Sequence, residues 1–125
     1  MSAQIKERKL GGGNVSWTID ENYKIVMTKG DTPTFTFDVF LPDGTSYEFE
    51  DGDSVVFAAK KNKYDTEPAF TIEADLETKT ITFSEDNTKA LEIGKYIWEL
   101  SLNKIDGYRC TFVANKILNL TVEVA

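Results

Sequence analysis

The chain has 125 residues, of which 41% are hydrophobic and 28% are charged, and its formal net charge at pH 7 is -7. This length fits one domain with a core of its own, and the composition is that of a globular protein rather than a disordered or fibrous one. A strongly acidic chain lacks the basic surface that releases counterions from phosphates, so nucleic acid is not expected as a partner. No stretch approaches the roughly 20 consecutive apolar residues of a membrane helix, so no membrane is expected either.

The sequence contains no histidine and one cysteine. These counts remove the Ser-His and Cys-His nucleophile pairs, the commonest metal ligand and any thiolate zinc site. Cys110 has no partner for a disulfide, and its aromatic neighbours Tyr108 and Phe112 favour a buried, inert thiol. Only a Ser-Lys or paired-carboxylate mechanism stays open. Because no set of residues with catalytic roles can be assembled, we expect no enzymatic activity, no cofactor, no metal and no small-molecule substrate.

Residues 1–22 differ in character from the rest of the chain. A charged start leads into three successive glycines at positions 11–13, which make the backbone costly to order. This pattern predicts a flexible N-terminal arm over 1–22, ahead of a domain over 23–125. Val15, Trp17 and Ile19 alternate like a short strand. Such a strand either packs against its own domain, which is the preferred interpretation, or adds to the sheet of a neighbour.

From residue 23 onward, short apolar runs alternate with turn signals, as in an all-β protein. The expected strands cover 23–28, 34–41, 45–49, 54–60, 69–76, 79–84, 95–103, 107–113 and 116–124. The Asp-Gly pairs at 43–44 and 106–107 predict hairpin turns, and the segments 51–53 and 77–79 can close further reversals. Most consecutive strands are therefore expected to be antiparallel neighbours.

Alternation along these strands places one face of each strand in a core and leaves the other face polar. The expected core residues are Phe35, Phe37, Val39, Leu41, Val55, Phe57, Phe70, Ile72, Ala74, Leu76, Ile81, Phe83, Tyr96, Trp98, Leu100, Leu102, Leu118, Leu120, Val122 and Val124. One-sided strands of this length and spacing predict two sheets packed face to face, with a small closed barrel as the alternative.

The segment 84–93 interrupts the strand pattern with a capping residue and helix formers before Gly94, which predicts one helical turn that crosses between the sheets. Tyr96 then stands near the start of a long strand after a crossover, which is the position of the tyrosine corner in immunoglobulin-type sandwiches. Trp98 stands where the second cysteine of antibody domains would fall, so the disulfide is missing. The expected fold is an all-β, immunoglobulin-like antiparallel β-sandwich of about 8 to 9 strands with one short helical crossover turn.

An ordered set of short motifs resembles small immunoglobulin-like domains of tailed-phage and prophage virion proteins, above all the N-terminal domain of the baseplate upper protein family. The motifs lie at 29–32, 35–39, 43–44, 52–61, 88–91 and 94–100, and the similarity covers roughly 23–124. The resemblance implies a non-catalytic virion structural or docking protein of the baseplate or tail, synthesised in the bacterial host cytoplasm. A head-fibre or decoration role is the alternative position.

Charge is unevenly distributed along the sequence. Acidic residues gather in 43–53 with no basic residue among them, whereas basic residues gather in 6–9 and 60–63. Solvated loops and edges are the simplest explanation. A complementary protein surface is the alternative.

Several aromatic and aliphatic residues fall where alternation does not require burial, and exposed aromatic residues mark protein interfaces more often than carbohydrate sites. The predicted interaction residues are Val15, Trp17, Ile19, Phe40, Tyr47 and Tyr64. They would contact other virion proteins or a second copy of the chain, through sheet edges and the N-terminal arm. Carbohydrate or host cell-surface binding is the alternative function.

Overall fold

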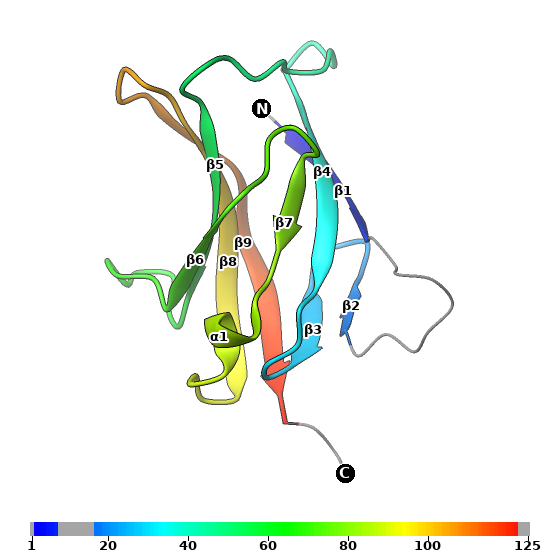
Figure 1. Cartoon of the computed structure of the whole chain (residues 1–125), viewed down its shortest axis with the longest axis vertical. Helices are drawn as coiled ribbons and strands as arrows, with labels where there is room; N and C mark the ends of the chain where they lie inside the picture. Colours follow the sequence, from blue (N-terminus) through cyan, green and yellow to red (C-terminus); the bar gives the residue numbers. More distant parts are fainter. Residues whose placement is uncertain (1, 8–16, 123–125) are drawn as a thin grey trace.

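The computed structural model describes residues 2–7 and 17–122. Its strands are β1 (Ser2–Glu7), β2 (Trp17–Ile19), β3 (Ile25–Thr28), β4 (Thr34–Phe40), β5 (Ser54–Lys60), β6 (Phe70–Glu73), β7 (Thr80–Thr82), β8 (Gly94–Asn103) and β9 (Arg109–Thr121), with a helix α1 (Glu85–Thr88). They form a three-stranded sheet in the order β1-β4-β7 and a six-stranded sheet in the order β2-β3-β9-β8-β5-β6 (Figure 1). The predicted all-β sandwich is confirmed.

The connectivity follows the immunoglobulin type. The chain passes from β4 in one sheet to β5 in the other, returns to β7 beside β4, and crosses again to the β8–β9 hairpin. The short helix α1 lies on this last crossover, as expected, with the Asn87 side chain accepting from the Ser84 N–H at 2.7 Å. Beyond it, the Tyr96 hydroxyl donates to the Glu92 carbonyl at 2.8 Å, four residues upstream. This hydrogen bond is the tyrosine corner that the sequence predicts.

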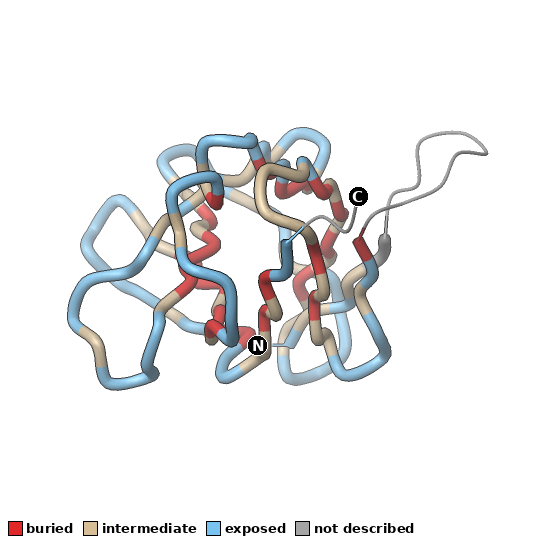
Figure 2. The backbone as a smooth tube through the Cα atoms, turned by 90° about the horizontal axis from the view of Figure 1, so that it is seen from below, coloured by how far each residue is buried: buried red, intermediate tan, exposed pale blue. Residues whose placement is uncertain are grey.

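An aromatic cluster joins the two sheets where an antibody domain has its disulfide. Trp98 of β8 stacks on Phe57 of β5 with ring centroids 5.1 Å apart, and it meets Phe35 of β4 at 6.1 Å. All three side chains are fully buried. In Figure 2 the buried residues line the inside of the sandwich and the exposed ones lie in the peripheral loops. Each such ring stabilises the fold by roughly 1.5–3 kcal/mol through burial.

Several of the expected core residues are less buried in the structure than the alternation predicts. Leu41, Phe70, Ile72, Ala74 and Leu76 are half-buried. Cys110, expected to be buried, is also only half-buried in β9. Val122 is 54% exposed, because β9 ends at Thr121 opposite Thr28, the last residue of β3. Val124 lies outside the described residues.

Two expected strand boundaries are wrong for reasons of pairing. The segment 45–49 forms no strand: after an isolated bridge between Ser46 and Phe40 it leaves β4 and leads to the other sheet. The two strands expected at 107–113 and 116–124 are the single long strand β9. Two register shifts in the β8–β9 pairing, between Trp98 and Leu100 and between Leu100 and Ser101, and a positive φ of 57° at Asn115 let β9 bend and still pair with β8 on both sides of the irregularity.

Consecutive strands are neighbours less often than expected. The pairs β2–β3, β5–β6 and β8–β9 are antiparallel neighbours, but every other pair of consecutive strands is divided between the two sheets. The strand β3 also pairs in parallel with β9. Sheet exchange of this kind is what a sandwich requires, because each sheet must cover the other. Within the described chain, no helix is long and apolar enough to span a membrane.

The sequence predicts a flexible arm over 1–22, and the described parts of this range include the strands β1 and β2. The strand β1 pairs with β4 along its whole length, and β2 pairs with β3. Trp17 is 7% exposed and belongs to the core, so the strand containing it packs on its own domain. The Tyr23 hydroxyl holds the free edge of β1: it accepts from the Ile5 N–H at 3.4 Å and donates to the Ala3 carbonyl at 3.2 Å. Val15 and the three glycines lie outside the described residues.

Candidate interaction surface

Two segments far apart in the sequence meet at one end of the sandwich, which we call the loop end: the β4–β5 connection (residues 41–53) and the turn of the β8–β9 hairpin (residues 104–108). Both lie at the top of Figure 1. The predicted Asp-Gly turns form there. In the first, the Asp43 carboxylate accepts from the Thr45 N–H at 3.0 Å. In the second, the Asp106 carboxylate accepts from the Tyr108 N–H at 2.9 Å.

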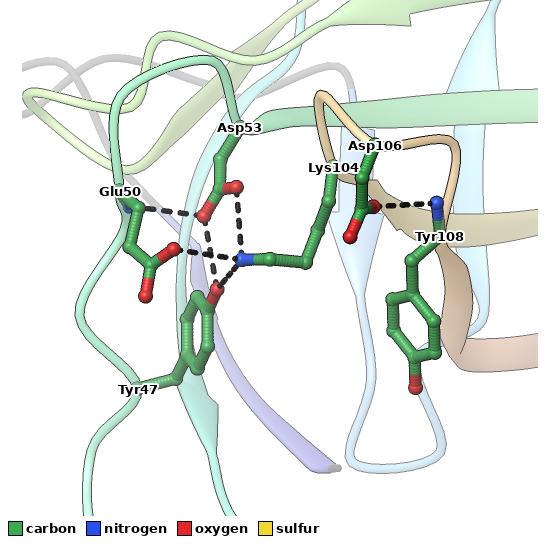
Figure 3. A network of polar contacts seen from close by, with 6 residues as sticks. All are labelled: Tyr47, Glu50, Asp53, Lys104, Asp106 and Tyr108. Atoms are coloured by element: carbon green, nitrogen blue, oxygen red, sulfur yellow. Dashed lines mark hydrogen bonds and ion pairs between the residues drawn. The ribbon is translucent and has the colours of Figure 1, made fainter.

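A network of polar side chains ties the two segments together (Figure 3). The Lys104 ammonium donates to Tyr47 Oη at 2.6 Å, to Asp53 Oδ1 at 3.1 Å and to Glu50 Oε2 at 3.3 Å. Asp53 Oδ2 in turn accepts from the Tyr47 hydroxyl and from the Glu50 N–H, each at 2.9 Å. The side chain of Asp53 is only 2% exposed, so its carboxylate exchanges water for these donors. A buried, fully paired carboxylate of this kind fixes the geometry of the loop end.

The charges of this network are stable at neutral pH. Burial by itself raises the pKa of Asp53, but the Glu50 N–H, the Lys104 ammonium and the Tyr47 hydroxyl together hold that pKa below its ordinary value. Hydrogen bonds to Tyr47 and Asp53 raise the pKa of Lys104. Burial raises the pKa of the Tyr47 phenol. Lys104 therefore remains an ammonium ion, which has no lone pair for nucleophilic attack or proton abstraction, and the network acts as a structural tie.

Two large apolar side chains are exposed beside this tie. Ile105 is 85% exposed and Tyr108 is 56% exposed, both on the hairpin turn. Ile105 lies against the backbone of the β4–β5 connection, because a Cβ on Gly52 would come within 3.0 Å of Ile105 Cβ. Gly52 also has a φ of +86°, which favours glycine. Glycine at this position thus permits both the turn and the close approach of the hairpin.

Acidic side chains are numerous in the two segments of the loop end. Asp43, Glu48, Glu50, Asp51 and Asp106 are all exposed there. The acidic stretch seen in the sequence therefore lies beside an apolar hairpin turn rather than on an isolated loop.

The predicted interaction residues are not brought together in one surface. Trp17 is buried in the core and cannot form part of an interface, whereas Ile19 and Phe40 are half-buried. Tyr47 is half-buried because its hydroxyl belongs to the loop-end network and its ring packs on that of Phe49, with centroids 5.6 Å apart. Tyr64 is 84% exposed on the β5–β6 connection, and this connection lies away from the loop end in Figure 1.

Sequence reasoning missed Ile105, Tyr108 and Lys104. One signal was present: an isoleucine directly before an Asp-Gly turn is an apolar residue at a position where burial is not expected. The contact between Lys104 and Asp53 had no such signal, because the two residues are 51 positions apart and lie next to the ends of two different strands.

A hollow lies on the outer face of the six-stranded sheet. Its volume is about 300 Å³, and its lining includes Lys60, Glu99, Ser101 and Arg109 but no aromatic side chain. The charged groups pair with one another: Glu99 Oε1 lies 3.9 Å from Lys60 Nζ and 3.2 Å from Arg109 Nη2. Among the described residues, no group of three or more His, Cys, Asp or Glu side chains is placed to hold a metal ion.

No protein-family model matches this chain, and no curated protein matches its sequence.

Proposed function

We propose that this protein is a non-catalytic structural and docking module of a phage or prophage virion, a baseplate or tail accessory made in the cytoplasm of the bacterial host. It works by binding other virion proteins. The observation that carries this proposal is the pair of exposed apolar side chains, Ile105 and Tyr108, on a hairpin turn held in place by the Lys104–Asp53 contact at 3.1 Å. Rigid, exposed aromatic and aliphatic anchors are the usual energetic centres of protein interfaces.

The chemistry of the loop end supports docking over catalysis. Its central lysine is held as an ammonium ion, and three donors already occupy most of the lone-pair directions of its central carboxylate. A catalytic acid or base would need a pKa near neutrality. The pKa of Lys104 is raised and that of Asp53 is lowered, which moves both away from neutrality.

The proposal is tested on virus particles. Lysate from a culture that carries the gene is banded on a density gradient, and the fractions are probed with an antibody raised against the recombinant chain. We expect the protein in the particle band, at a constant ratio to the main tail protein through a second gradient. Protein that stays at the top of the gradient with the soluble fraction would contradict a virion role.

Matched variants then connect the particle to the loop end. Ile105→Asp combined with Tyr108→Ala should abolish incorporation, whereas Tyr64→Ala, which removes an exposed aromatic ring elsewhere, should leave it unchanged. Both variants should keep the unfolding temperature of the parent chain, because all three side chains are mostly solvent-exposed. Equal incorporation of the two variants would place the virion contact on another surface.

A further inference from the structure

We infer, building on the proposed docking function, that the loop end binds a basic protein partner, one that offers an apolar hollow for Ile105 and Tyr108 within a rim of lysine and arginine side chains.

The apolar part of the surface is presented in a fixed geometry. The hairpin turn is closed by a hydrogen bond from the Lys104 N–H to the Tyr108 carbonyl at 2.8 Å, and the side chain of Lys104 binds the β4–β5 connection. Ile105 is seated over Gly52. A turn that is held by its own backbone hydrogen bond and by the neighbouring β4–β5 connection loses little conformational entropy when a partner covers it. The two anchors are thus set up for binding before the partner arrives.

The charge of the surface selects the partner. The two loop-end segments contain the carboxylates of Asp43, Glu48, Glu50, Asp51, Asp53 and Asp106. The ammonium of Lys104 forms ion pairs with Asp53 and Glu50. Within the described chain, Glu48, Asp51 and Asp106 form no ion pair. A partner that buries Ile105 must therefore approach an excess of negative charge. An acidic or neutral surface would leave these carboxylates repelled or uncompensated, whereas a basic rim pairs with them and speeds association.

Charges at the rim remain partly hydrated, so they contribute mainly to the association rate and to specificity, while the apolar anchors set the lifetime of the complex. This division gives two separate signatures. Loss of the anchors should shorten the lifetime of the complex, and loss of the carboxylates should slow association and remove its salt dependence.

The experiment uses the full chain and a yeast-displayed library of random 12-residue peptides as the probe. The library is selected on the parent chain and depleted on Ile105→Asp. We expect enriched peptides that combine several lysines or arginines with at least one apolar residue. Their binding should weaken about 30-fold or more in Tyr108→Ala, as it does when a central interface anchor is removed. Tyr64→Ala serves as the matched control and should bind like the parent.

A triple variant, Glu48→Gln, Asp51→Asn and Asp106→Asn, tests the charge. Its association rate should fall about tenfold at low salt and become nearly independent of NaCl concentration. Enriched peptides that are acidic or neutral would overturn the inference, and so would a depletion on Ile105→Asp that removes every peptide that binds the parent chain. Light scattering that shows a dimer of the parent chain and a monomer of Ile105→Asp would also overturn it, because the surface would then bind a second copy.

The two proposals can fail separately. A protein that bands with particles but selects no basic, Ile105-dependent peptides keeps its virion role and loses this surface. A protein that is missing from particles but binds such peptides loses the virion role and keeps the surface.

Discussion

Replacement of Trp98 by alanine tests whether the aromatic cluster holds the two sheets together. Trp98 is fully buried, stacks on Phe57 at an interplanar angle of 21° and approaches Phe35 of the opposite sheet. Its indole N–H donates to the Tyr23 carbonyl at 3.2 Å. The Trp98→Ala variant thus loses a stacked ring, an inter-sheet contact and a hydrogen bond to the turn before β3.

We expect Trp98→Ala to lower the free energy of unfolding by about 3–5 kcal/mol, the usual cost of truncating a large buried ring. For a chain of 125 residues, an unfolding entropy of roughly 2.1 cal/mol/K per residue means that 1 kcal/mol corresponds to about 4 °C. The melting temperature should therefore fall by about 11–19 °C. Trp98→Phe, which keeps a ring but loses the hydrogen bond to Tyr23, should cost about 1–3 kcal/mol.

Urea unfolding followed by far-UV circular dichroism measures both variants, and an unchanged dependence on urea concentration shows that the unfolding reaction is the same. Tyr64→Ala is the matched control, because it removes an aromatic ring that is 84% exposed, and it should shift stability by less than about 0.5 kcal/mol. If Trp98→Ala were as stable as Tyr64→Ala, the cluster would not be what joins the sheets.

Three further predictions concern the loop end and β1. Gly52→Ala should cost about 1–3 kcal/mol in urea unfolding, because φ is +86° and the new Cβ meets Ile105, whereas Gly44→Ala has a similar φ of +89° in open space and should cost less. Asp53→Asn should be less stable than the parent chain, and the difference should be largest at neutral pH. The folded-state pKa of Asp53 lies below the ordinary 3.8, so the stability that its carboxylate contributes is present above that value and disappears as pH falls through the folded-state pKa. Tyr23→Phe should speed amide exchange in β1 about fivefold, since it removes two hydrogen bonds from that edge.

Each of these has an outcome that contradicts it. Equal costs for Gly52→Ala and Gly44→Ala would mean that the hairpin does not press on the β4–β5 connection. A stability difference between the parent chain and Asp53→Asn that persists unchanged at pH 2 would assign the loss to packing and not to charge. Unchanged exchange at the Ile5 amide in Tyr23→Phe would show that β4 alone holds β1.

Local pattern was sufficient where a residue's neighbours in the chain decide its conformation. Strict alternation located β4, Asp-Gly pairs located the turns at 43–44 and 106–107, and Tyr96 after a crossover located the tyrosine corner. These features predict a sandwich of immunoglobulin type, because period-2 burial and glycine turns depend on backbone geometry within a few residues.

The tertiary structure decided whatever depends on contacts between distant segments. The strand β1 follows no strong alternation and precedes three glycines, so only its pairing with β4 and the Tyr23 hydroxyl show that it belongs to the sandwich. The loop end arises in the same way, since Lys104 reaches Asp53 across 51 positions and Ile105 lies against Gly52. Alternation thus indicates which face of a strand points inward, whereas depth of burial, sheet order and the meeting of loops are set by packing the two sheets together, which no local pattern encodes.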